Sequence, residues 1–150
     1  MSFFSTRSAY GADCQYIKTL GRAVFDLYGP YGDILSSWFL SGVTHTIVAS
    51  SGEKKTGFAM LALTSGVAEL LAIAVEPAMQ GRGVGALLMD EVINKARRSK
   101  VKYFMLHTAV ENSTAQALFE KYGFVRSGIS ASFYPKGQDA FIMTRHIYDE

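Results

Sequence analysis

A run of alternating glycines, Gln80-Gly81-Arg82-Gly83-Val84-Gly85, is the stretch of this chain whose residue types point most clearly to chemistry. It follows an apolar segment typical of a strand and precedes a segment with helical periodicity. At such a junction, backbone N–H groups and the positive end of a helix dipole converge and can hold phosphate. Glycines would let a diphosphate approach the main chain, and Arg82 could add charge at the rim. A tight, closely packed turn would have the same composition, so the loop alone leaves both interpretations open.

Two common nucleotide-binding motifs do not fit this loop. No Gly-Lys-Ser or Gly-Lys-Thr follows the glycines, which excludes a P-loop. A dinucleotide fingerprint fits poorly, because the glycines are spaced G-x-G-x-G and the strands before them form a meander. The surrounding elements must therefore identify the ligand.

Metal and disulfide chemistry are disfavoured by the residues present. Cys14 is the single cysteine, so the chain cannot form an intrachain disulfide or supply a thiolate zinc site by itself. His45, His107 and His146 fall on different predicted strands, and their spacing indicates no metal triad. We expect no metal ion and a reducing, cytoplasmic environment.

Two helices are predicted in the first third of the chain. Apolar residues recur at the helical period after Asp13 until Gly29-Pro30 halts the pattern. A second, shorter helix is expected to follow Asp33 and to end before Gly42.

The rest of the chain alternates between strand and helix patterns. Residues 45–49, 56–63 and 67–75 predict three strands in an antiparallel meander. A crossover helix over 83–99 then leads to a parallel strand over 103–108, whose continuous apolar run is typical of a strand covered on both faces. Asn112 or Ser113 opens another helix, with Gln116 completing a capping box with Ser113, and Gly123 ends it. Two final strands are expected over the ranges 124–132 and 140–146.

Length and composition favour one domain over residues 1–150. The chain has 49% hydrophobic and 19% charged residues, enough apolar material for one core, and no linker or repeat divides it. A net charge of +2 gives no strong field for nucleic acid or an anionic membrane, so we expect neither as a partner. The N-terminus shows no secretion signal, and the longest apolar runs are far shorter than the ~20 residues that span a bilayer.

Three segments together resemble the GNAT superfamily of acyl-CoA-dependent N-acetyltransferases. They are Ala-Glu-Leu-Leu-Ala-Ile-Ala-Val-Glu-Pro at 68–77, Gln80-x-x-Gly83-x-Gly85, and Leu-Phe-Glu-Lys-Tyr-Gly-Phe at 118–124. The resemblance covers essentially the whole chain. It implies an α/β (α+β) fold with a mixed central sheet of about seven strands, helices on both faces, and a splayed parallel pair of strands that holds CoA.

The resemblance also implies acetyl-CoA as co-substrate and a set of residues that bind it. The loop from Gln80 to Gly85 would bind the pyrophosphate, and the strand ending at Ile73-Ala74-Val75 would bind the pantetheine arm through its backbone. A backbone N–H near Val75 would face the thioester oxygen. The full set of expected cofactor contacts is Ile73, Ala74, Val75, Gln80, Gly81, Arg82, Gly83, Val84, Gly85, Asn112 and Phe119.

The catalytic groups are predicted partly by resemblance and partly by a departure from it. Deprotonating a lysine amine (pKa ~10.4) at pH 7 costs roughly 4.6 kcal/mol, against about 1 kcal/mol for an α-amine near ~7.8, so a base matters most for lysine. Glu69 stands where many relatives carry a glutamate base, although a solvated strand-edge carboxylate is equally expected there. In this family a tyrosine of the last helix usually protonates the departing thiolate, but Phe119 stands at that position here. Tyr122 could be the acid instead, and His107 could act as a proton shuttle. Both residues are also compatible with packing roles.

The acceptor is predicted from the last third of the chain. Phe133-Tyr134 followed by Asp139-Ala140 and Met143 is similar to a signature of the ribosomal-protein alanine and protein N-terminal acetyltransferases. In that branch Tyr134 and the loop with Tyr28 and Tyr31 would flank a peptide N-terminus. Three functions stay open: a protein N-terminal acetyltransferase, a small-molecule amine acetyltransferase, and a CoA-binding module with little turnover. The protein is expected to be a monomer or homodimer.

Overall fold

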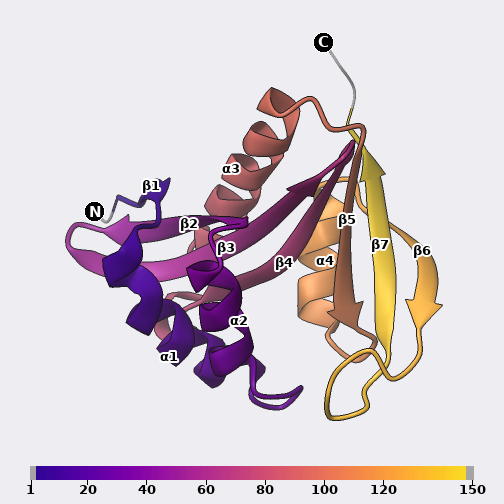
Figure 1. Cartoon of the computed structure of the whole chain (residues 1–150), viewed down its shortest axis with the longest axis horizontal. Coiled ribbons are helices and arrows are strands. Elements are labelled where there is room, and N and C mark those ends of the chain that lie inside the picture. The colour runs from indigo at the N-terminus through magenta and orange to yellow at the C-terminus, as the bar shows by residue number, and fades with distance from the viewer. Residues whose placement is uncertain (1–2, 148–150) are drawn as a thin grey trace.

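Seven strands form one mixed sheet, in the order β1-β2-β3-β4-β5-β7-β6, within residues 3–147, which the computed structural model describes (Figure 1). The strands are β1 Ser5–Ser8, β2 Thr44–Ser51, β3 Lys54–Thr64, β4 Val67–Val75, β5 Tyr103–Ala109, β6 Val125–Ser130 and β7 Ala140–His146. The helices are α1 Cys14–Phe25, α2 Tyr31–Leu40, α3 Val84–Arg98 and α4 Ser113–Lys121, with 3-10 turns at Gly11–Asp13 and Pro77–Met79.

The predicted order of strands and helices is confirmed. Strands β2, β3 and β4 pair antiparallel in sequence, as the meander requires. Helix α3 then crosses to β5, which pairs parallel with β4, and β7 and β6 complete the sheet antiparallel to β5 and to each other. The fold is therefore the mixed α/β arrangement that the resemblance implied.

The helices cover the sheet in two pairs, one on each face, and each pair closes its own apolar core (Figure 1). One core lies under α3 and α4 and includes Leu88, Phe104 and Leu106. The other lies under α1 and α2 and includes Ile17 and Phe58. Within the described residues, none of the helices is long and apolar enough to cross a membrane.

Strands β4 and β5 pair over only part of their length. Their parallel register runs from Val67 opposite Tyr103 to Leu70 opposite Leu106 and then stops, although both strands continue. Figure 1 shows the two strands meeting at one end and separating toward the other. A bulge in β4 lies at the point of separation, because Leu61 pairs with Leu70 while Met60 pairs with Ala72.

Leu71 is the extra residue of this bulge, and it reverses the faces of β4. Ala68 and Leu70 pack in the core under α3 and α4, whereas Ala72 and Ala74 pack in the core under α1 and α2. Glu69 consequently projects toward α1 and α2, whereas Ile73 and Val75 contact the opposite core.

Three details differ from the sequence prediction. Helix α2 begins at Tyr31 and not after Asp33, because Pro30 occupies the N-cap position. The cap of α4 is Asn112, whose side chain accepts a hydrogen bond from the Ala115 N–H (3.2 Å), so the capping box predicted for Ser113 does not form. The short strand β1 was not predicted, because its four residues are polar and show no apolar alternation.

Candidate active site

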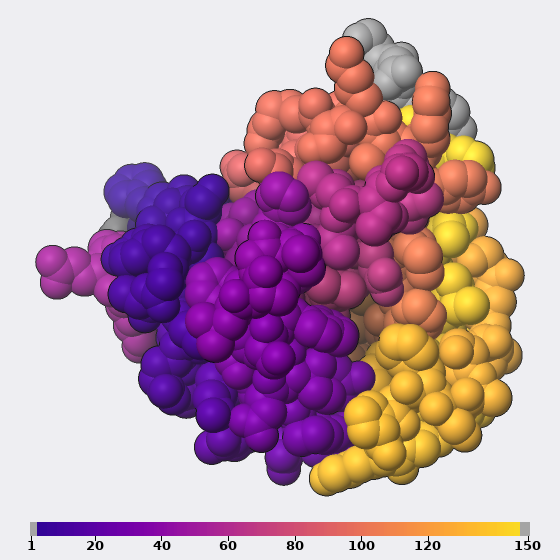
Figure 2. Space-filling model, in the orientation of Figure 1, coloured from indigo at the N-terminus to yellow at the C-terminus, as the bar shows by residue number. Residues whose placement is uncertain are grey.

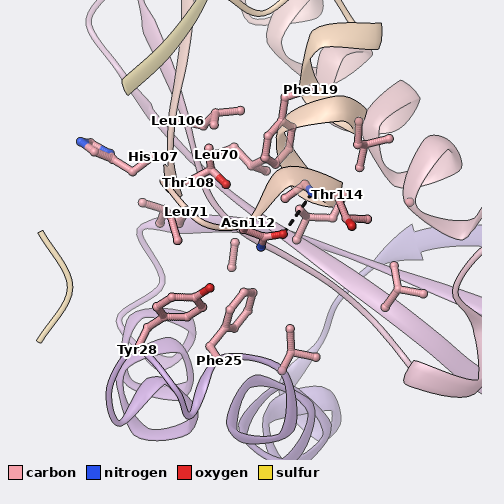
Figure 3. Close-up of a pocket in the computed structure, with 18 of the residues that line it drawn as sticks. Phe25, Tyr28, Leu70, Leu71, Leu106, His107, Thr108, Asn112, Thr114 and Phe119 are labelled. Atoms are coloured by element: carbon pink, nitrogen blue, oxygen red, sulfur yellow. Dashed lines mark hydrogen bonds between the residues drawn. The ribbon is translucent and has the colours of Figure 1, made fainter. Parts of the chain in front are cut away.

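A cavity of about 690 Å³ opens where β4 and β5 separate. Its walls come from both faces of the sheet, so it passes between the two strands. Figure 2 shows the surface hollowed between the purple and magenta segments and the orange β6–β7 segment, and Figure 3 shows side chains converging on the same space. Of the predicted site residues, the cavity is lined by Tyr28, Tyr31, Glu69, Ile73, Val75, Gln80, Gly81, Gly83, Gly85, His107, Asn112, Phe119 and Tyr134.

The glycine loop forms the cavity wall at the start of α3. Gly81 and Gly83 have φ values of +79° and +89°, the left-handed region that glycine adopts without strain. Gly83 is the N-cap of α3, and no side chain caps this helix end. The first N–H groups of a helix have no intrahelical acceptor, so these donors and the positive end of the dipole remain available to an anion. Arg82 is exposed beside the loop but does not line the cavity, and the side chain of Val84 is buried in the core.

The edge of β4 beyond Leu70 provides main-chain groups along the cavity. Residues 72–75 remain paired with β3 on one side, but the register of β4 with β5 has ended on the other. Ile73 and Val75 line the cavity, whereas the side chain of Ala74 is buried in the core under α1 and α2. An extended ligand with amide groups could bind this free edge as an added strand does.

Helix α4 closes the same side of the cavity with an apolar wall. Phe119 lines the cavity, is only 4% exposed and packs edge-on against Phe124, with ring centroids 6.2 Å apart. The loop before the helix is held by Gln116, whose amide donates to the carbonyls of Ala109 and Val110 (both 2.9 Å). Asn112 caps the helix as shown by the dashed line in Figure 3 and also lines the cavity.

Glu69 and His107 form a polar pair on the opposite side, facing α1 and α2. His107 Nδ1 lies 3.7 Å from Glu69 Oε2, and the ring of His107 stacks on Phe133 at 4.0 Å with an interplanar angle of 7°. Burial lowers the pKa of His107 below its ordinary value, although the charge of Glu69 partly opposes this. In Figure 3, His107 extends away from Phe119 and α4. The neutral imidazole is therefore favoured near neutral pH, and it can accept a proton.

Three tyrosines cluster beside this pair: Tyr28 in the α1–α2 loop, Tyr31 at the start of α2, and Tyr134 in the β6–β7 loop. Tyr134 packs on Tyr28 (ring centroids 4.7 Å apart) and on Tyr31 (6.2 Å). Burial raises the pKa of all three phenols, most strongly that of Tyr134, so they remain protonated hydrogen-bond donors.

The β6–β7 loop is fastened to the α1–α2 loop across the cavity. The Lys136 N–H donates to the Tyr28 carbonyl (3.1 Å), and the Gln138 amide donates to the Leu27 carbonyl (2.9 Å). A Cβ on Gly29 would lie 2.8 Å from Pro135, so this contact requires glycine. We call residues 133–138 the strap, because they bridge the two halves of the molecule on the side of Glu69 and His107.

Tyr122 lies outside the cavity lining, unlike the other two predicted catalytic residues. Its hydroxyl donates to the Ala86 carbonyl (2.9 Å), and its ring packs against the core under α3 and α4. Burial and the nearby Asp90 carboxylate raise its pKa. The geometry gives Tyr122 a structural contact between α4 and α3.

Comparison with known proteins identifies the family. The acetyltransferase (GNAT) family matches residues 15–124, which is most of the chain. The chain belongs to the GNAT acetyltransferase family. Its mixed seven-stranded sheet agrees with this assignment.

Among individual proteins, this GNAT chain is similar to ribosomal-protein and N-terminal acetyltransferases. It is 32% identical over 97 residues (63% of this chain, 66% of the relative) to the ribosomal protein bS18-alanine N-acetyltransferase of Salmonella typhimurium. It is 34% identical over 106 residues (67% and 65%) to the N-alpha-acetyltransferase RimI of Mycobacterium tuberculosis. The crystal structure of the ribosomal-protein-S18-alanine N-acetyltransferase from Escherichia coli superposes with a TM-score of 0.82 at 25% identity, covering 99% of this chain and 96% of that one. The matched segments span about two thirds or less of the length of these curated relatives.

Several cavity residues of this GNAT domain were missed by sequence reasoning. Phe133 stacks on His107, and Phe25, Trp38, Leu71 and Thr108 also line the cavity. Phe133 stood next to Tyr134 in the quoted signature, so its position was a usable signal. The others look like core residues in the sequence, and only the separation of β4 from β5 brings them to one space.

Proposed function

We propose that this chain transfers the acetyl group of acetyl-CoA to the α-amine at the N-terminus of a protein or peptide. One observation carries the proposal: a single cavity passes between β4 and β5, with an uncapped glycine-rich helix start on one face and a proton-accepting pair on the other. Two substrates that enter from opposite faces of the sheet would meet in it.

The residues of the α3–α4 side fit acetyl-CoA. The free N–H groups at Gly83 and the start of α3 suit the pyrophosphate, and the open edge of residues 71–75 suits the amides of pantetheine. When bound, acetyl-CoA supplies an activated thioester to which an amine can add. Main-chain N–H groups of β4 on this edge are the candidate donors to the thioester oxygen.

Glu69 and His107 serve as the proton acceptor for the incoming ammonium group. An α-amine near pKa ~7.8 needs only about 1 kcal/mol to lose its proton at pH 7, so a neutral imidazole suffices as base. The Glu69 carboxylate, 3.7 Å from Nδ1, stabilises the imidazolium that results. Phe119 offers no hydroxyl for the departing thiolate, whose protonation is then left to water or another group; a thiol near pKa ~8.5 makes this tolerable.

The strap and its tyrosines favour a peptide N-terminus as acceptor. The strap bridges the acceptor side, which restricts the space beside Glu69 and His107 to a slender chain end, and the phenols can donate to peptide carbonyls. Among the described residues that line the cavity, Glu69 is the one carboxylate. A polyamine carries several positive charges, and a single carboxylate in the cavity would leave most of them without a counter-charge. The names of the relatives point the same way.

The proposal is tested by measuring acetyl transfer by mass spectrometry on two panels, peptides with free N-termini and small amine metabolites. Transfer to the N-terminal amine of peptides, abolished by N-terminal blocking but not by blocking lysines, is the expected result. Transfer to small amines alone would overturn the assigned acceptor. If calorimetry detects acetyl-CoA binding but neither panel is acetylated, the chain is a CoA-binding module.

A further inference from the structure

The Phe133 ring lies face to face with the His107 imidazole. The ring centroids are 4.0 Å apart and the planes deviate by 7°, while the edge of the imidazole points at Glu69. Phe133 itself is 39% exposed, so it covers His107 from the solvent side and is not part of a core. Its position must therefore be fixed by the loop that carries it.

The strap fixes Phe133 by hydrogen bonds on both sides of it. The Ser132 N–H donates to the Asp139 carboxylate (2.8 Å), which closes the base of the loop. The Tyr134 N–H donates to the Gln138 carbonyl (3.2 Å), and the Tyr134 ring packs edge-on against Phe133 with centroids 5.0 Å apart. Together with the contacts to the α1–α2 loop described above, these bonds hold the ring in one place.

We propose that Phe133 is a positioning residue that shields the His107 imidazole from water and holds it beside Glu69, where the ring can accept the acceptor's proton. This inference rests on the proposed function. It adds that the strap, besides flanking the acceptor, controls the ionisation of the base.

Of the residues that face His107, Glu69 is the one whose charge acts on the imidazole. Across the sheet, β7 presents Ile142 opposite His107, and β6 presents Gly128 next to Ile142. The strap contributes Phe133 and Tyr134, and Tyr134 stays neutral because burial raises its pKa. Glu69 raises the pKa of His107, whereas burial lowers it more strongly. Removing the Phe133 ring should therefore admit water and move the pKa of His107 up, toward its ordinary value of about 6.5.

The experiment is an NMR titration of the histidine rings in the unmodified protein, Phe133→Ala and Phe133→Leu. The His107 signal is assigned with a His107→Gln variant, and an unchanged titration of His45, whose pKa is lowered by burial, reports that each variant is folded. We expect the pKa of His107 to rise in Phe133→Ala and to change little in Phe133→Leu, whose side chain still excludes water. An unchanged or lower value in Phe133→Ala would overturn the inference. A fall in both variants would instead indicate that the aromatic face stabilises the charged imidazole, which also overturns it.

Kinetics separates this inference from the proposed function. If His107 is the base, Phe133→Ala should lose up to about fourfold in kcat/KM near pH 6 and recover near pH 8, where the imidazole is neutral in both proteins. A shifted titration with an unshifted pH–rate profile would remove His107 as base and leave the effect of Phe133 on its ionisation standing.

Discussion

Alanine at the two glycines that begin α3 should have opposite consequences, although the two positions are only two residues apart. Gly83 has a φ of +89°, and nothing lies within 4 Å of a Cβ built on it. Gly83→Ala therefore meets no clash but must hold an L-residue in the left-handed region, at a cost of about 1–2 kcal/mol. Gly85 has no such φ, and its Cβ would lie 3.4 Å from Leu118 and 3.9 Å from Val75, which are ordinary contacts. Gly85→Ala should keep or slightly raise stability, because alanine is the better helix residue.

The same difference should appear in the affinity for acetyl-CoA. If Gly83→Ala relaxes the loop in the free protein, binding must restore the left-handed turn, and a cost of about 1–2 kcal/mol weakens Kd about 5- to 30-fold. Gly85→Ala should stay within about threefold of the unmodified protein, because its methyl group fits against Leu118. Gly83→Glu should abolish binding, since it adds a carboxylate where the pyrophosphate is expected.

Calorimetric titration of all three variants with acetyl-CoA provides the measurement, and thermal unfolding provides the control for the fold. If Gly83→Ala binds as tightly as the unmodified protein while Gly85→Ala loses affinity, the left-handed turn is not what holds the cofactor. The phosphate site would then have to lie further along α3.

Three further substitutions test the Glu69–His107 pair, the absence of a general acid at position 119, and the stability of the fold. Glu69→Gln should lower turnover more near pH 7 than near pH 9, where free amine is abundant; equal losses at both pH values would argue against a role in proton transfer. Phe119→Tyr should raise the single-turnover rate by at most about 30-fold, the ~2 kcal/mol that protonating the thiolate can provide, and an unchanged rate means that no acid is missing. Asp13→Asn should lower the free energy of unfolding at neutral pH by about 2–3 kcal/mol in urea denaturation, because it weakens the bonds of a buried carboxylate to Arg7 and Lys55. Since these cations lower the pKa of Asp13, its contribution is present above about pH 4 and is lost as the pH falls, so the two proteins should converge in acid.

Hydrophobic periodicity and the glycines and prolines that end elements predicted most helices and strands, because apolar residues mark the buried face of each element. The strands of the meander, helix α3 and the end of α4 at Gly123, with its φ of +87°, follow directly from such patterns. Strand β1 carries no comparable pattern, because it joins the sheet edge through main-chain pairing with β2 and its side chains are polar. A strand held mainly by its backbone leaves little trace in the sequence.

Competition between similar residues limited the prediction of the α4 start. Asn112 and Ser113 are both good N-cap residues, and Gln116 suits a capping box with Ser113. The structure uses Asn112, because Gln116 is needed elsewhere: its amide holds two carbonyls of the preceding loop while its oxygen accepts from Arg126 (2.7 Å). The choice depends on Arg126 of β6, which lies outside the helix, so the pattern of the first helical turn could not decide it.

The bulge in β4 shows most directly why the sequence could not predict which way the site residues of this strand project. Residues 67–75 are apolar almost throughout, so no alternation in them reveals that Leu71 is an extra residue. In an unbroken strand, Glu69, Ile73 and Val75 would project from the same face. The bulge sends Glu69 toward the tyrosines and the strap while Ile73 and Val75 contact the α3–α4 core. A strand that changes faces where its neighbour departs can serve a cofactor on one side and an acceptor on the other. Restoring a regular strand by deleting Leu71 should therefore either move Glu69 away from His107 or reverse Ile73 and Val75, and in both cases the two halves of the cavity would lose their common boundary.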